Sequence, residues 1–368
     1  MRKLLAAVFA IAVMNGVSIG NFPGDGSRAN AVYASGVFIQ EGETNPALSG
    51  GDMRKTAAVD AVSQGTSGYI APEIYDGLID DLVNVGKVSH LDTRINIDGE
   101  VRYHYASNSG YRQLKDSSGL RVYLALDKAL TRDWKVYAKL EGKKDLLNYD
   151  NNVKFSRLYV TGKFGDSIMH AGSFGYLMAD GNIYDSGFDG IRADFTGPLK
   201  YTLSYGQTNY TKKTSIATVR YDDFDYNLEA GVYHYQADDG RQNTIRTFGT
   251  NYNFSNLGIG AMAFNSSRKD SKGSGNGYVL GLNYGDLKSW RLGTFEAFAK
   301  YYDQPEHTYI AHGMNGIGGR MQGFKGYGLG IQYTVAQNVV AGVEYYDMTD
   351  KVTGEKGQTL WGQLTHYF

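Results

Sequence analysis

The sequence feature that most constrains the fold is a regular alternation of apolar and polar side chains across residues 119–206. In its first segment Leu120 and Leu124 share one parity, while Arg121 and Asp127 fall on the other. Side chains of a β-strand point alternately to opposite faces, so a period of two predicts strands with one apolar and one charged face. The charged face belongs in water, and the apolar face needs a protein core or a lipid.

Composition narrows this choice. The 368 residues include no cysteine, which excludes disulfides and thiolate metal sites, and a net charge near zero gives no indication of a nucleic-acid partner. Glycine (48) and tyrosine (30) are abundant and proline (5) is scarce. Many short alternating segments with weak hydropathy are typical of a membrane β-barrel, and abundant tyrosine fits the aromatic girdles of such barrels.

Sixteen strands are predicted by continuing the alternation to the C-terminus. Their ranges are 91–105, 119–127, 133–143, 153–164, 167–175, 188–196, 199–207, 215–222, 225–236, 243–254, 257–266, 276–285, 293–303, 323–335, 338–347 and 358–368. Every second connection is short and the intervening ones are longer and polar, which predicts tight periplasmic turns at one end and extracellular loops at the other. Pro198 and Pro305 both fall in connections, where a closed sheet tolerates them.

These features together favour an all-β, closed antiparallel transmembrane barrel over a soluble β-sandwich. In a closed barrel every backbone N–H and C=O group can form a hydrogen bond and no strand edge is left unpaired. The hydrocarbon core of a membrane requires both, because it offers no water to backbone groups. Sixteen strands enclose a lumen wide enough for an aqueous channel.

The N-terminal quarter has a different character. Arg2 and Lys3 precede the apolar run 4–14, which predicts a signal peptide over 1–31, with cleavage as late as residue 34. The run is too short for a spanning anchor. Residues 35–87 are expected to form a flexible extension with a short helix after Pro72, with a barrel plug or a periplasmic tether as the alternatives, and 88–368 form the barrel.

Charged residues on the polar parity are the predicted pore lining. They are Arg94, Arg102, Arg121, Lys135, Lys139, Arg157, Arg192, Arg220, Arg246, Lys300, Glu100, Glu141, Asp194, Glu229, Glu296 and Glu344. Their mixed signs indicate no ion preference. Two connections could fold inward and narrow the pore, 304–322 and 176–187, and we favour 176–187 because the adjacent FDG sequence fixes its return.

The chain ends in an alternating strand, LWGQLTHYF. Leu364 and the terminal Phe368 share its outward parity and resemble the C-terminal assembly signal of bacterial outer-membrane barrels, which implies the barrel-assembly machinery as a partner.

A resemblance adds to this interpretation. The run FSRLYVTGKFGDSIMHAGSFGYLMADGNIYDSGFDGIRADF resembles the central signature of the porins of diderm Firmicutes and related bacteria, and the likeness covers roughly 88–368. It is most specific at Arg157, Tyr159, Gly162, Lys163, Gly165, Gly172, Asp189 and Gly190. Members often carry an N-terminal surface-layer-homology domain, of which 35–87 contain no recognisable copy. The resemblance implies a channel for small hydrophilic solutes.

The leading functional hypothesis is an outer-membrane porin for passive diffusion of ions and small hydrophilic solutes. A structural or adhesive barrel without an open pore is the alternative, and a barrel enzyme ranks third because no catalytic, cofactor or metal-binding constellation is legible. His307 and His312, five residues apart in one loop, are weak evidence for a metal site. Outer-membrane lipid is the expected surrounding, and a homotrimer is the expectation from general porins.

Overall fold

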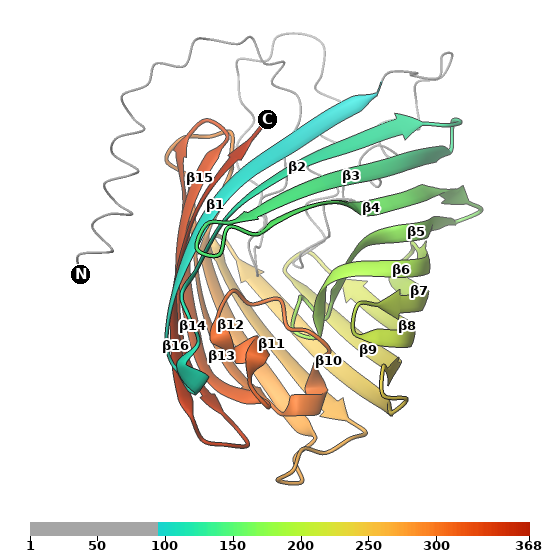
Figure 1. Ribbon diagram of the computed structural model, residues 1–368. Coiled ribbons are helices and arrows are strands. Elements are labelled where there is room, and N and C mark those ends of the chain that lie inside the picture. Colours follow the sequence, from blue (N-terminus) through green and yellow to red (C-terminus); the bar gives the residue numbers. More distant parts are fainter. Residues whose placement is uncertain (1–94) are drawn as a thin grey trace.

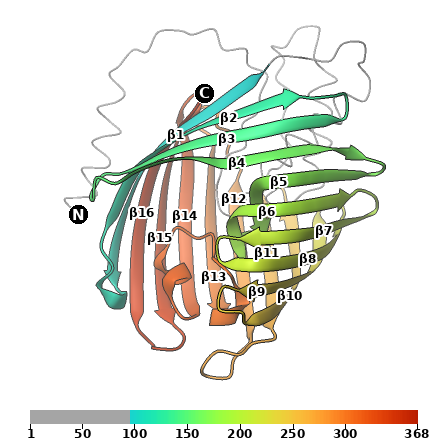
Figure 2. The same ribbon diagram turned by 45° about the vertical axis from the view of Figure 1, so that its right-hand side comes forward.

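Sixteen antiparallel strands form a closed barrel in the computed structural model, which describes residues 95–368 (Figures 1 and 2). Each strand pairs with its neighbours in the chain, and β1 pairs with β16 to close the ring. The predicted fold class and strand number are confirmed. The predicted signal peptide, the extension over 35–87 and Arg94 lie outside the described residues.

The strands are β1 (Asn96–Gly110), β2 (Ser117–Ala129), β3 (Trp134–Asp145), β4 (Asn151–Phe164), β5 (Ser167–Met178), β6 (Tyr184–Phe195), β7 (Leu199–Thr208), β8 (Thr211–Asp222), β9 (Tyr226–Ala237), β10 (Gln242–Phe254), β11 (Leu257–Ser266), β12 (Asn276–Gly285), β13 (Phe295–Gln304), β14 (Phe324–Ala336), β15 (Val339–Asp350) and β16 (Lys356–Tyr367). Short 3₁₀ turns occur at η1 (Tyr111–Gln113), η2 (Glu306–Thr308) and η3 (Ile317–Arg320). No helix in residues 95–368 is long and apolar enough to cross a bilayer.

The outer face carries the apolar parity. Leu280 and Leu282 are each 49% exposed in the middle of β12. Aromatic side chains flank this middle band, since Tyr278 stacks on Tyr301 towards one rim and Tyr284 packs on a phenylalanine towards the other. An apolar band between two aromatic girdles is the surface that a bilayer requires.

The two rims differ in their connections. At the turn end the connections are 130–133, 165–166, 196–198, 223–225, 255–256, 286–294 and 337–338. At the loop end they are 111–116, 146–150, 179–183, 209–210, 238–241, 267–275, 305–323 and 351–355. Several loop-end connections are shorter than predicted because polar residues continue the strands. Residues 106–110, predicted as loop, are paired with β16 over Trp361–Gly357.

The last residue extends the ladder between β1 and β16 by one position. Gly99 and Phe368 exchange backbone hydrogen bonds of 2.8 and 3.0 Å. A Cβ on Gly99 would lie 2.3 Å from the Phe368 ring, so the ring occupies the space above the glycine. Leu364 and Phe368 lie on the outward parity as predicted, and their role in assembly stays a prediction.

Candidate functional site: a constriction inside the barrel

The β5–β6 hairpin leaves the barrel wall at its loop end. β4 and β5 are paired only over Leu158–Phe164 and Ser167–Ser173, although both strands continue beyond this ladder. β6 pairs with β7 only from Phe188 onward. The remaining part of the hairpin, 174–187, is therefore held by its own two strands, and we call it the hairpin tip.

Glycines explain where the hairpin bends. Gly172 has φ +127°, a conformation that side chains rarely adopt, and a Cβ there would lie 2.5 Å from the Leu158 carbonyl oxygen. Gly190 lies opposite Gly206 in the β6–β7 ladder, and the Phe188 ring lies close to both. The missing side chains let the backbones and this ring approach closely enough for the tip to turn into the lumen.

One face of the hairpin tip packs against the inner wall. Phe188 is fully buried, with its ring centroid 5.5 Å from that of Phe174 and 5.1 Å from that of Tyr176. The Tyr176 hydroxyl is 2.9 Å from Ser204 Oγ of β7. The same cluster continues to the inward side chains of β8–β11, including Ile245 at 0% exposure. Burying each such side chain contributes roughly 1.5–3 kcal/mol, so the tip is firmly attached there.

The long connection 305–323 also lies inside the barrel, and we call it the lumen loop. Figures 1 and 2 show this orange segment within the ring of strands. Its Ile310 and Ala311 amides donate to the Ile183 carbonyl at 2.9 and 3.1 Å, and the Gly313 amide donates to Gly181 at 2.9 Å. The hairpin tip and the lumen loop are thus bound to each other. Both connections considered for the constriction contribute to one structure.

The far half of the lumen loop is bound to β15 and β16. The Asn315 side-chain amide donates to both carboxylate oxygens of Glu344, at 3.1 and 2.9 Å. The Tyr346 hydroxyl donates to the same carboxylate at 2.6 Å, and the Ile317 amide donates to Thr359 Oγ1 at 3.1 Å. Glu344, a predicted pore-lining residue, therefore holds the loop in place.

We expect Glu344→Ala to loosen the lumen loop. Hydrogen bonds to a charged group contribute about 1.5–3 kcal/mol, and two donors would lose their acceptor. Single-channel recordings should show larger and more frequent current fluctuations than wild type, with the barrel still folded. Glu344→Gln, which keeps an acceptor oxygen, should fall between the two. Identical current noise in all three proteins would contradict this role.

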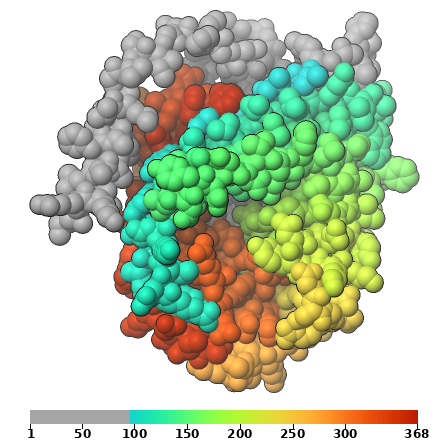
Figure 3. All heavy atoms as spheres, in the orientation of Figure 1, coloured from blue at the N-terminus to red at the C-terminus, as the bar shows by residue number. Residues whose placement is uncertain are grey.

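A cavity of about 450 Å³ remains between β1–β4 on one side and the hairpin tip and lumen loop on the other. Figure 3 shows a hollow below the green band of β4, with orange atoms of the lumen loop inside it. Its charged lining residues are Arg102, Arg121, Lys139, Glu141, Lys143, Lys154, Arg157, Asp180, Asp185, Asp189 and Lys300. The hairpin tip, the lumen loop and the apolar cluster they form with β8–β11 lie on the other side of this cavity.

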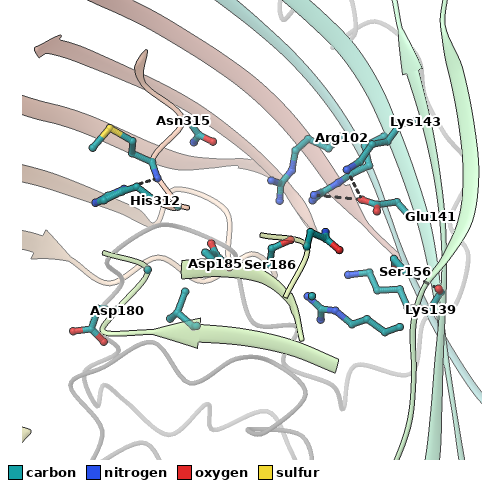
Figure 4. Close-up of a pocket in the computed structure, with 18 of the residues that line it drawn as sticks. Arg102, Lys139, Glu141, Lys143, Ser156, Asp180, Asp185, Ser186, His312 and Asn315 are labelled. Carbon is teal, nitrogen blue, oxygen red and sulfur yellow. Dashed lines mark hydrogen bonds and ion pairs between the residues drawn. The ribbon is translucent and has the colours of Figure 1, made fainter. Parts of the chain in front are cut away.

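Opposite charges face each other across the cavity (Figure 4). Arg102, Lys139 and Lys143 project from the wall, Asp185 of the hairpin tip lies on the opposite side of the cavity, and Asp180 lies farther away at the end of the tip. We call the six basic side chains of β1–β4 that line the cavity the basic wall; they are Arg102, Arg121, Lys139, Lys143, Lys154 and Arg157. Charged rings and clusters at a narrow point set the selectivity of a pore.

Because the tip folds inward, side chains on the outward parity of β6 face the lumen beyond the bend. Asp185, Asp189 and Ile191 share one parity of β6. Ile191 is 52% exposed on the outer surface, yet Asp185 and Asp189 line the cavity. The alternation in sequence continues unchanged, but beyond the bend the outward face of the hairpin faces the lumen. These acids were therefore absent from the predicted lining.

His312 carries no charge in the constriction at neutral pH. Burial in the lumen loop, with a smaller contribution from the nearby Lys300, lowers its pKa to about 3. Its Nδ1 accepts a hydrogen bond from the Met314 amide at 3.0 Å. In residues 95–368 no group of three or more histidine, aspartate or glutamate side chains could hold a metal ion.

Several predicted lining residues lie beside the hairpin instead of in the cavity. Arg192 Nε is 2.7 Å from Asp194 Oδ2, and its guanidinium lies 4.8 Å from the centroid of the Tyr176 ring. Arg220 pairs with Asp222 at 2.7 Å and lies 3.7 Å from Glu229. These groups face inward but form an ion-pair network in the wall of β6–β9.

The remaining predicted residues are distributed along the wall. Glu100 is fully buried beside Arg102 and Arg121, and Glu141 and Lys300 line the cavity. Lys135 and Glu296 lie near the turn end of β3 and β13, on the inward parity.

Arg246 differs from the prediction, because it lies on the outer face. Its Nη1 donates to Asn265 Oδ1 at 3.2 Å, and both side chains are exposed. Phe248, two residues on, is 57% exposed on the same parity. Arg246 lies close to the loop end, where the outer face has polar surroundings. Its charge therefore does not show that its side chain faces the pore.

Solved structures of bacterial porins resemble the chain. The Salmonella typhi OmpF structure in complex with daunomycin matches with a TM-score of 0.52 and 12% identity, over 75% of this chain and 98% of that chain. A triple mutant of the Rhodopseudomonas blastica porin matches with a TM-score of 0.50 and 14% identity, over 75% and 100%. No protein-family model and no curated protein matches the sequence. At these identities the likeness establishes a shared fold, the sixteen-stranded porin barrel.

Proposed function

We propose that the protein is an outer-membrane channel for passive diffusion of ions and small hydrophilic solutes. The observation that carries this proposal is the charged cavity inside a closed barrel whose outer surface is apolar. Charged side chains around a water-filled space replace part of the hydration of a passing solute, while the apolar band faces lipid. The shared porin fold supports the same conclusion.

Conductance of the refolded protein in planar bilayers tests this function. We expect stepwise current increments, and liposomes containing the protein should swell in solutions of small sugars. A folded barrel that gives neither current nor swelling would favour the alternative, a structural or adhesive barrel without an open pore.

We also propose that the channel belongs with the porins of diderm Firmicutes, on the strength of the resemblance around Arg157 and Gly190. Export by the N-terminal signal and insertion by the barrel-assembly machinery complete this proposal, with Leu364 and Phe368 as the recognition residues. Replacement of Phe368 by serine should reduce the amount of folded protein in the outer membrane, while a serine at the exposed loop residue Tyr149 should not.

Association into a homotrimer is proposed on a separate observation. Residues 151–157 of β4 have no ladder partner on the β5 side, and Val153 and Phe155 are 72% and 70% exposed. An open sheet edge is not tolerated in hydrocarbon, so this part of the wall needs protein cover, which a second copy can supply. Native mass spectrometry should show trimers that Phe155→Lys weakens. Monomeric wild-type protein would contradict it.

A further inference from the structure

Like charges lie directly opposite each other in the basic wall. In the ladders of β1–β3, Arg102 pairs with Arg121, and Arg121 pairs with Lys143. In the next ladder Lys139 pairs with Arg157. Directly opposed like charges destabilise a sheet. Three such pairs on one inner surface indicate that the surface is arranged for a negatively charged occupant.

Counter-charges within the wall only partly neutralise it. Glu100, fully buried, lies 2.5 Å from Arg121 and 3.1 Å from Arg102, and Glu141 lies 3.3 Å from Lys143. With Lys300 the cavity is lined by seven basic and four acidic residues, an excess of three positive charges, and counting Glu100 leaves two. Lys154 lies opposite Glu141 in the β3–β4 ladder, on the part of β4 that has no partner on the β5 side, and forms none of the ion pairs found in residues 95–368.

Few acidic side chains line the side of the cavity opposite the basic wall. Asp180 lies in the connection between β5 and β6, and burial raises the pKa of its carboxyl group. The acidic residues of β6 that line the cavity are Asp185 and Asp189, against six basic side chains in the basic wall. A narrow passage with an excess of one sign attracts solutes of the opposite sign.

We propose that the basic wall is an anion-binding track, and that the channel carries small anions such as carboxylates and phosphates in preference to cations of similar size. This inference rests on the proposed channel function. Anions would pass along the rows formed by Arg102, Arg121 and Lys143 and by Lys139 and Arg157.

Reversal potentials in a potassium chloride gradient test this selectivity. Wild type should reverse towards the chloride potential, and Lys143→Glu combined with Lys154→Glu should lower the chloride-to-potassium permeability ratio about threefold or more, because the lining charge changes by four. Inorganic pyrophosphate should reduce the chloride current of wild type more than that of this double variant.

Lys144→Glu is the matched control for Lys143→Glu. Lys144 is the next residue of β3, lies on the opposite face and does not line the cavity, so the same charge change should leave the reversal potential unaltered. Heat-modifiable migration in gels checks that each variant is folded. A wild-type channel that conducts without preference or prefers potassium would overturn the inference and leave the channel function intact. Absence of any conductance would overturn both.

Discussion

Removal of the lumen loop is expected to raise the single-channel conductance about twofold or more, because the loop occupies cross-section that sixteen strands would otherwise leave to water. The change is replacement of residues 306–322 by Asn-Gly. Only Glu306 and Arg320 carry full charges in this segment, so its net charge is zero and the expected increase is geometric. The largest solute that passes should also increase in size, so that larger sugars enter proteoliposomes.

Shortening of the other long loop-end connection provides the control. Residues 268–274 belong to the connection between β11 and β12, which contributes no residue to the cavity. Their replacement by the same Asn-Gly turn should leave conductance within the scatter of wild type. Equal conductance of a folded 306–322 variant and wild type would show that the passage is narrowest elsewhere.

The substitution Gly190→Val is expected to prevent the hairpin from folding inward. A Cβ on Gly190 would lie 2.3 Å from the Tyr205 carbonyl oxygen and 2.7 Å from the Gly206 Cα, which are backbone atoms that cannot move aside cheaply. Overpacking of this kind costs about 3 kcal/mol. Urea unfolding in detergent micelles should show the loss of stability, and bilayer recordings should show a wider or unstable pore.

Gly187→Val on the same strand is the matched substitution. A Cβ on Gly187 would meet no atom within 4 Å, so the same side chain should change stability by only a few tenths of a kcal/mol at such an open site. Similar unfolding curves for the two variants would refute the account of the bend given by Gly190 and Gly206.

Strand pairing shows why some predicted boundaries were wrong. Residues 184–187 were assigned to a loop because the connection is long and polar, yet they form the first part of β6 and pair with β5. Backbone hydrogen bonds continue the ladder there, and the pattern of side chains does not reveal these hydrogen bonds. Of the connection predicted over 176–187, only 179–183 lies outside strands.

The constriction could be anticipated only in part. The glycines at 172 and 190 were already prominent in the sequence, and both connections that meet in the lumen were singled out. That they bind each other depends on contacts such as Ile310 with Ile183, which are 127 positions apart and have no local pattern. Asn315, which anchors the loop to Glu344, likewise has no signal in the sequence.

The sequence alone determined the barrel, its strand number and the direction of most side chains. Polar and apolar residues alternate along each strand, and they indicate which side chains face water and which face an apolar solvent. Tertiary structure decided which of these faces line the passage. At the bend near Gly172 and Gly190 the hairpin changes sides of the wall, so Asp185 and Asp189, on the outward parity, come to face the basic wall. Parity describes a strand relative to its own sheet, and only the path of that sheet through space places its faces in water or in lipid.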